Sequence, residues 1–188
     1  MSSITLPRAS TNPPGLKTHV YVNSLAGLYS LTTLIEGATT AVLIDPPQTT
    51  SDAEGILRWI KSITVNPITA IFSSHHHPDH YWSADIILNA YPKAKFYATP
   101  HTCNEIKRDV EEKATFVRAW YGDDVLAKPR LPDPYPFTFF VLPGNPSEPV
   151  ILLGPLQGDT VNCTMFWLPG EATVITGDIV FGRNTHVW

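Results

Sequence analysis

The sequence has little cysteine and no surplus of basic residues. Its 2 cysteines, Cys103 and Cys163, are too few for a disulfide framework, so we expect a reducing compartment. Lysine and arginine number 13 against 17 aspartates and glutamates, which gives a net charge of -4. This balance leaves no basic footprint of the kind that nucleic-acid-binding proteins carry. We therefore expect no nucleic-acid partner.

Long hydrophobic runs are also missing. The first 15 residues are polar, include Pro7, Pro13 and Pro14, and contain no apolar segment of the kind that a secretory signal needs. No later stretch reaches the roughly 20 apolar residues of a transmembrane helix. We therefore predict a cytoplasmic protein with no membrane partner.

The length of 188 residues is enough for one domain with a sizeable core. We predict a flexible N-terminal arm over residues 1–16 and one domain over 17–188. A continuous apolar run at 41–44 and the mostly apolar segment at 68–72 indicate buried strands. The segment between them has helical spacing that begins with a capping box, Ser51 and Glu54. This alternation is typical of an α/β fold. Other strands are predicted at 19–22, 28–36, 95–98, 137–142, 150–153, 162–168 and 172–176, and other helices at about 80–91 and from Thr99 or Thr102 towards Tyr121.

A histidine-rich stretch directly follows the predicted strand at 68–72. Four of the 7 histidines lie within residues 75–80. Imidazole and carboxylate groups are the ligands that zinc prefers. His75 and His77 are two residues apart, so in an extended segment their rings project to the same side. Asp79 and His80 follow on a turn, where they could serve a second metal; a solvated loop in which Asp79 only caps a helix is the alternative.

The order of strand, H-x-H-x-D-H and helix resembles the first metal motif of the metallo-β-lactamase superfamily. Gly-Asp-Thr at residues 158–160 and Thr-Gly-Asp at 176–178 fall where that family places its next ligands. The resemblance runs from about residue 17 to the end. It implies an αβ/βα sandwich, of which this chain would contain all of one half and part of the other.

The resemblance also implies two bound metal ions, with zinc as the expected cofactor. His75 and His77 would bind the first ion. Asp79 and His80 would bind the second, and Asp178 would bridge both. We expect Asp79 and Asp178 to be catalytic as well. Two neighbouring ions would lower the pKa of a shared water, and the resulting metal-bound hydroxide would attack a carbonyl group.

The chain departs from the family pattern in two places. The third ligand of the first metal is usually a histidine in the family, where this chain has Asp159. A carboxylate makes the site harder, which could favour manganese or iron over zinc. The family's last histidine lies well downstream of the bridging aspartate, and here His186 follows Asp178 too closely. We therefore expect either that the protein continues beyond Trp188 or that a second chain completes the site.

Asp45 ends the predicted strand at 41–44. In the family an aspartate at this strand end supports the metal loop, and Asp45 resembles it. A turn-initiating aspartate before Pro46 is an equally good interpretation of the residue on its own.

Together these residues predict a metal-dependent hydrolase of a small carbonyl substrate, namely a lactone, lactam or thioester. The proline-rich, aromatic stretch at 122–149 is predicted to be a loop that lines the substrate entrance. Two alternatives are a mononuclear iron dioxygenase on the same scaffold and a non-catalytic binding protein with a vestigial metal site. Metal analysis separates the three, with two zinc-like ions, one iron or none.

Overall fold

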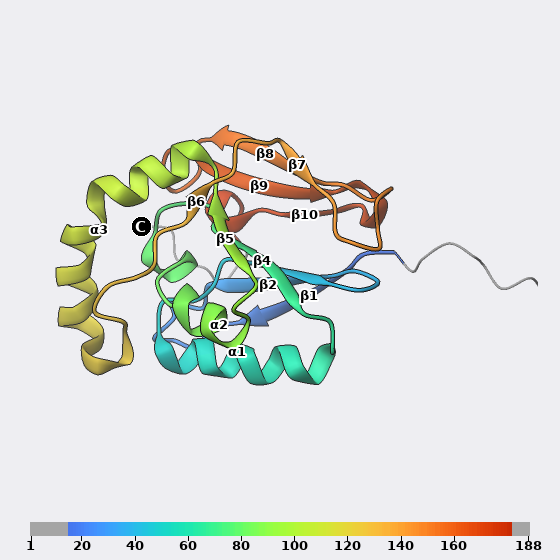
Figure 1. Ribbon diagram of the computed structural model, residues 1–188. Coiled ribbons are helices and arrows are strands. Elements are labelled where there is room, and N and C mark those ends of the chain that lie inside the picture. The colour runs from blue at the N-terminus through green and yellow to red at the C-terminus, as the bar shows by residue number, and fades with distance from the viewer. Residues whose placement is uncertain (1–14, 182–188) are drawn as a thin grey trace, which may run out of the picture.

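The computed structural model describes residues 15–181 of the chain. Two β-sheets pack face to face, and helices α1 (Thr50–Ile63) and α2 (Ala84–Ala90) cover the outer face of the first sheet (Figure 1). Helix α3 (Pro100–Tyr121) lies at one end of the two sheets. Between residues 15 and 181 no helix is both long and apolar enough to cross a bilayer.

The first sheet has six strands in the order β1-β2-β3-β4-β5-β6. The pairs β1–β2 and β2–β3 are antiparallel, and the pairs from β3 to β6 are parallel. Helix α1 connects the parallel neighbours β3 and β4, as the strand–helix–strand pattern predicted. The strands are β1 (Lys17–Val22), β2 (Leu31–Glu36), β3 (Ala41–Ile44), β4 (Ile68–Phe72), β5 (Lys95–Ala98) and β6 (Asp133–Pro134).

The second sheet is antiparallel, with the order β10-β9-β8-β7. On its outer face Trp167 pairs with Ile151 and Val174, and the side chains of Trp167 and Val174 are 39% and 44% exposed. No helix among the described residues covers this face, so the predicted sandwich with an incomplete second half is confirmed for this part of the chain. The strands are β7 (Phe139–Phe140), β8 (Val150–Leu156), β9 (Cys163–Leu168) and β10 (Thr173–Ile175).

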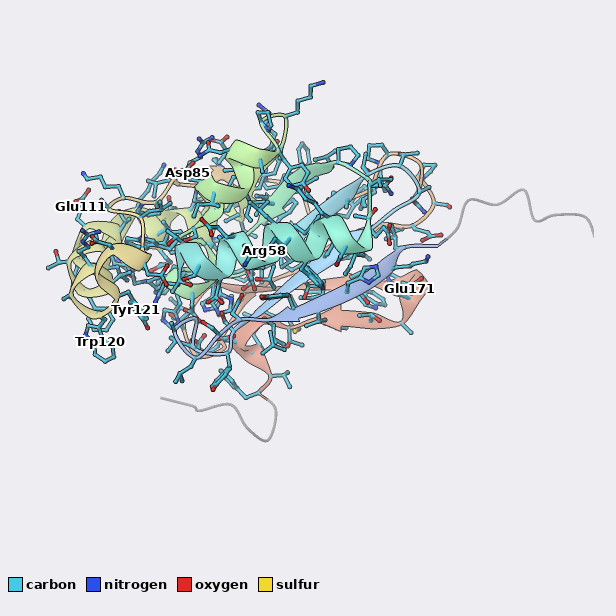
Figure 2. All side chains as sticks on the ribbon, turned by 90° about the horizontal axis from the view of Figure 1, so that it is seen from below. Arg58, Asp85, Glu111, Trp120, Tyr121 and Glu171 are labelled. Atoms are coloured by element: carbon cyan, nitrogen blue, oxygen red, sulfur yellow. The ribbon has the colours of Figure 1, made fainter. Side chains whose placement is uncertain are left out.

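Alternation along the central strands produces two cores. Leu43 and Ile71 pack against α1 and α2, whereas Val42 and Phe72 pack against the second sheet. Because successive side chains of a strand point to opposite faces, a fully apolar strand buries both of its faces. On the outside, Figure 2 shows Arg58 on the face of α1 that is turned away from the sheets.

The start of α1 differs from the prediction. The N-cap is Thr49, whose hydroxyl accepts a hydrogen bond from the Asp52 backbone N–H at 3.2 Å and donates one to the Asp52 carboxylate at 2.9 Å. The predicted pair, Ser51 and Glu54, lies two residues further on. Ser51 is already inside the helix, and its backbone N–H donates to Asp124 at 2.9 Å. A hydroxyl cap was therefore predicted correctly, but its position was wrong. Asp52 also accepts from the Thr49 hydroxyl and not from the N-cap backbone N–H, as it would in a capping box.

The described part of the chain begins close to the end of the predicted N-terminal arm. Most of the predicted N-terminal arm, and His186 and Trp188, lie outside the described residues. Leu16 does not belong to a free arm, because it is 2% exposed in the core between the sheets. Its backbone N–H also donates to Glu148 at 2.7 Å. The folded domain therefore includes Leu16.

Phe72 joins the two sheets, and replacing it with alanine should be strongly destabilising. Its ring stacks on Phe140 at 4.8 Å between centroids and meets Tyr135 and Phe166 edge-on. Truncating a buried phenylalanine costs about 3–5 kcal/mol of unfolding free energy. Urea denaturation of Phe72→Ala should show this loss. The matched variant Phe139→Ala, at a ring that is 54% exposed, should stay close to the native protein; equal losses would contradict this description of the core.

Candidate metal centre

The candidate metal ligands come from three loops that the sheets bring together. The histidine loop (residues 73–80) follows β4, the Asp159 loop (158–162) joins β8 to β9, and the third loop follows β10. The Ser74 carbonyl accepts a hydrogen bond from the Thr164 backbone N–H at 2.9 Å, which ties the histidine loop to the second sheet. The candidate ligands of each loop therefore lie at the end of a strand, where a rigid scaffold positions the functional groups of loops.

One ligand group consists of His75, His77 and Asp159. The Asp159 carboxylate lies 2.7 Å from His77 Nδ1 and 3.8 Å from His75 Nε2. The rings of His75 and His77 are 5.0 Å apart between centroids, so both reach the same carboxylate as their spacing predicted. The structure thus places Asp159 beside the two histidines assigned to the first ion.

A second group consists of His75, His80 and Asp178. His80 Nε2 lies 3.4 Å from Asp178 and 3.2 Å from Asp79. Asp79 belongs to neither three-residue group but adjoins the second one through His80. The rings of His75 and His80 are 4.1 Å apart, so the two groups are contiguous. All six predicted ligands are therefore brought together, although Asp178 adjoins only one group in this arrangement.

Asp45 orients two of these histidines. Its buried carboxylate accepts hydrogen bonds from the Ser74 backbone N–H at 2.6 Å and the Ser74 hydroxyl at 2.8 Å, and lies 3.0 Å from His80 Nδ1. The Ser74 hydroxyl also contacts His75 Nδ1 at 2.9 Å. Because that hydroxyl donates to Asp45, it can only accept from His75 Nδ1–H. In its neutral form each of these histidines then presents Nε2 as the lone-pair nitrogen.

The donor set fits a metal. His75 Nε2 is buried and has no hydrogen-bond partner, although buried polar atoms rarely lack one. His80 Nε2 is also buried, and the Asp79 and Asp178 carboxylates lie 3.2 and 3.4 Å from it. Metal-bound histidines characteristically donate their other ring N–H to a carboxylate or similar acceptor, as His80 can to Asp45 and His75 to Ser74. Two nitrogens and several carboxylates at this spacing suit zinc, manganese or iron.

Two glycines allow the loops to approach closely. Gly177 has a φ of 51°, and a Cβ added there would lie 2.7 Å from the Ser74 hydroxyl. At Gly158 a Cβ would lie 3.0 Å from the Asp178 carbonyl, which also accepts from the Asp159 backbone N–H at 3.2 Å. The glycine before each aspartate is therefore needed for steric reasons. A side chain at Gly177 would clash with Ser74, and one at Gly158 would clash with the Asp178 segment.

In the metal-free chain, burial and neighbouring charges shift the pKa values of His75 and His80 in opposite directions. Burial, with the positive charge of His80, lowers the pKa of His75 well below its usual value. Burial also opposes the charged form of His80, but Asp79 and Asp45 outweigh it and raise the pKa of His80 well above the usual value. For Asp79, burial raises the pKa but the charge of His80 and its hydrogen bond lower it overall.

These shifts predict pH-dependent metal binding at His80. Metal binding requires the neutral imidazole, so an ion at His80 must displace a proton, whereas an ion at His75 need not. Affinity at the position of His80 and Asp178 should fall about tenfold for each pH unit below the raised pKa of His80. Calorimetry in buffers of different ionisation enthalpy measures the protons released. Binding at the His80 position without proton release would show that this histidine is neutral in the free protein.

Sequence reasoning missed Ser74 as a member of the site. Its hydroxyl links Asp45 to His75, and its backbone N–H binds Asp45 as well. The only signal was its place directly before the first histidine. The segment at 122–149 contains β6 and β7, and its Tyr135 packs on Phe72 in the core between the sheets. A role for this segment at the substrate entrance stays a prediction.

Comparison with known proteins agrees with this geometry. The family model of the metallo-beta-lactamase superfamily matches residues 25–188. The chain therefore belongs to the metallo-beta-lactamase superfamily, as the motif predicted. No curated protein matches it.

Solved structures show the same fold. The BLEG-1 B3 metallo-beta-lactamase aligns with a TM-score of 0.64 at 16% identity, covering 89% of this chain and 74% of that one. For the DIM-1 metallo-beta-lactamase the TM-score is 0.60 at 21% identity, with 92% and 74% covered. The inverting sec-alkylsulfatase Pisa1 from Pseudomonas sp. gives 0.56 at 20% identity, with 77% and 27% covered. The identities are low, so these likenesses establish the fold alone.

Proposed function

We propose that this protein is a metal-dependent hydrolase of a small carbonyl substrate, namely a lactone, lactam or thioester. The observation that carries the proposal is a pair of buried nitrogens beside carboxylates: His75 Nε2, which has no hydrogen-bond partner, and His80 Nε2, which faces Asp79 and Asp178. Two divalent ions bound there would supply Lewis acidity and activate water near neutral pH. Zinc is the expected metal.

The chain's own residues would hold the ions and leave one side of the site open. His75 and His80 are buried, whereas the side chains of His77 and Asp178 are 37% and 27% exposed. A substrate would therefore approach from the side of His77 and Asp178. Burial raises the pKa of Asp79, but the charge and hydrogen bond of His80 lower it overall, so the carboxylate is anionic and is positioned to accept a proton beside His80. The Ser30 hydroxyl, which donates to the Gly27 carbonyl at 2.8 Å, also lies 3.2 Å from the Asp79 backbone carbonyl.

A specific observation favours a second candidate function. His75, His77 and Asp159 form a set of two histidines and one carboxylate, and such a set with open positions is typical of non-haem iron oxygenases. The second candidate is therefore a mononuclear iron dioxygenase. Zinc is also bound by two histidines and a carboxylate in hydrolases, so the ligand set alone leaves both reactions open.

Hydrolysis assays and metal analysis together test the proposal. Chelator-treated protein would be reconstituted with zinc, manganese or ferrous iron and screened against lactones, lactams and thioesters. We expect hydrolysis with two ions per chain, lost on chelation and in Asp178→Asn. Oxygen consumption with one iron per chain would favour the dioxygenase, and absence of metal binding would favour a non-catalytic binding protein. A cytoplasmic location, and completion of the second metal position by further residues or a second chain, stay predictions.

A further inference from the structure

Helix α3 carries three charged residues on the side that faces the metal-bearing loops. Glu105, Asp109 and Lys113 are spaced four residues apart, so they lie along one face of the helix. Their side chains are only 12%, 19% and 18% exposed. At the far end of α3, Trp120 points away from the sheets into solvent (Figure 2). The inward face of α3 is therefore polar where the helix meets the loops.

Lys113 contacts the backbone of the histidine loop. Its ammonium group donates to the carbonyl oxygen of His76 at 2.6 Å and pairs with Asp109 at 3.0 Å. The accepting carbonyl lies between the two ligands His75 and His77, so the contact fixes the peptide that connects them. Burial lowers the pKa of Lys113 although Asp109 opposes the change, in keeping with an ammonium held inside the protein.

His76 extends this contact to the Asp159 loop. Its Nε2 lies 3.5 Å from the Asp109 carboxylate and 3.5 Å from the Thr160 hydroxyl. Although it stands between two predicted ligands, His76 belongs to neither ligand group. The residue is 6% exposed and reaches from the histidine loop towards both α3 and the residue after Asp159.

The same face of α3 also holds the Asp159 loop directly. Glu105 accepts a hydrogen bond from the Asn162 side-chain amide at 3.1 Å. The Thr102 hydroxyl donates to the Asn162 carbonyl at 3.0 Å. The helix thus binds the loop that carries His75 and His77 at one point and the loop that carries Asp159 at another.

We infer that Glu105, Asp109 and Lys113 form a brace that sets the separation of the histidine loop and the Asp159 loop, and so tunes the first metal position. The inference rests on the proposed metal function. His77 and Asp159 come from different loops, so their 2.7 Å contact depends on how those loops are spaced. Packing alone would be served as well by apolar residues, because burying charged groups is costly and an apolar replacement is often neutral or stabilising. Directed hydrogen bonds, by contrast, hold a fixed geometry.

Lys113→Met tests the brace, because it keeps the apolar stem and removes the ammonium group. Chelator-treated protein would be titrated with cobalt(II), with calorimetry and the visible d–d spectrum followed for each position. We expect the affinity of the first position to fall about 10–100-fold, the usual range for a group that supports a metal ligand. Its spectrum should change, while the position at His80 and Asp178 keeps its affinity. Lys113→Arg retains a donor and should recover part of the loss.

Lys107→Met is the matched control, because Lys107 is exposed on the same helix and should leave both positions unchanged. Urea denaturation separates a general loss of stability from a change at the metal. Native affinity and spectrum in Lys113→Met, whatever its stability, would overturn the brace and leave the proposed function intact. Absence of cobalt binding in the native chain would overturn the proposed function and the brace with it.

Discussion

Replacing His75 with alanine is expected to reduce the metal bound from two ions per chain to one and to abolish hydrolysis. His75 stands in both ligand groups, but one nitrogen binds one ion, and the second position keeps His80, Asp79 and Asp178 without it. The Nδ1 atom of His75 is engaged by the Ser74 hydroxyl, so Nε2 is its single available ligand atom. Without it the first position keeps only His77 and Asp159, and affinity there should fall by roughly 100-fold or more, beyond the 10–100-fold typical of a supporting residue.

Metal analysis after dialysis, followed by calorimetric titration, measures the effect of His75→Ala. The matched control is His101→Ala, an exposed histidine at the start of α3, which should bind metal like the native protein. Circular dichroism of the metal-free variants would check that both fold. Two ions at native affinity in His75→Ala would mean that this histidine is not a ligand and that the first position has been assigned wrongly.

Asp45→Ala is expected to be both strongly destabilising and damaging to metal binding. The substitution removes the carboxylate that accepts two hydrogen bonds from Ser74 and lies beside His80 Nδ1. Asp45, Ser74 and His80 are all buried. Leaving such partners unsatisfied costs about 3 kcal/mol of unfolding free energy. Because Asp45 also sets which nitrogen of His75 and His80 is free, affinity at the His80 position should fall about 10–100-fold.

Asp45→Asn separates the two effects. Asp45 has a φ of 58°, and asparagine tolerates this left-handed conformation better than alanine does. Asparagine also keeps one oxygen that can accept from Ser74. We therefore expect a smaller loss of stability in urea than for alanine, but a similar loss of metal affinity at His80. Native stability and metal affinity in Asp45→Ala would contradict the role given to this residue.

Much of the fold could be predicted because local pattern and burial agree. The run at 41–44 is apolar at every position and the segment 68–72 at every position except Thr69, and the structure places them as β3 and β4 between two layers. The start of α1 was predicted two residues too late. Thr49 and Ser51 are both suitable cap residues, and the contact that Ser51 makes from inside the helix is with Asp124, 73 residues away in sequence. Contacts between residues so far apart cannot be predicted from the local sequence pattern.

The site was predictable to the same extent. His75, His77, Asp79 and His80 follow one another, so their spacing alone indicates metal chemistry. The residues that orient these ligands could not be predicted from spacing. The Asp45 contacts depend on β3 and β4 being parallel neighbours. The Lys113 contact depends on how α3 crosses the end of the sheets, although charged residues at 105, 109 and 113 were a visible signal of a polar helix face.

The central claim is that the two histidine–carboxylate groups hold two divalent ions, and zinc titration of the chelator-treated chain tests it most directly. Calorimetry on the native protein, His77→Ala and Asp178→Ala would give the number and affinity of sites. We predict two ions per chain, with binding at one position lost in His77→Ala and at the other in Asp178→Ala. No zinc binding, or binding that neither substitution changes, would contradict the assignment of this metal centre.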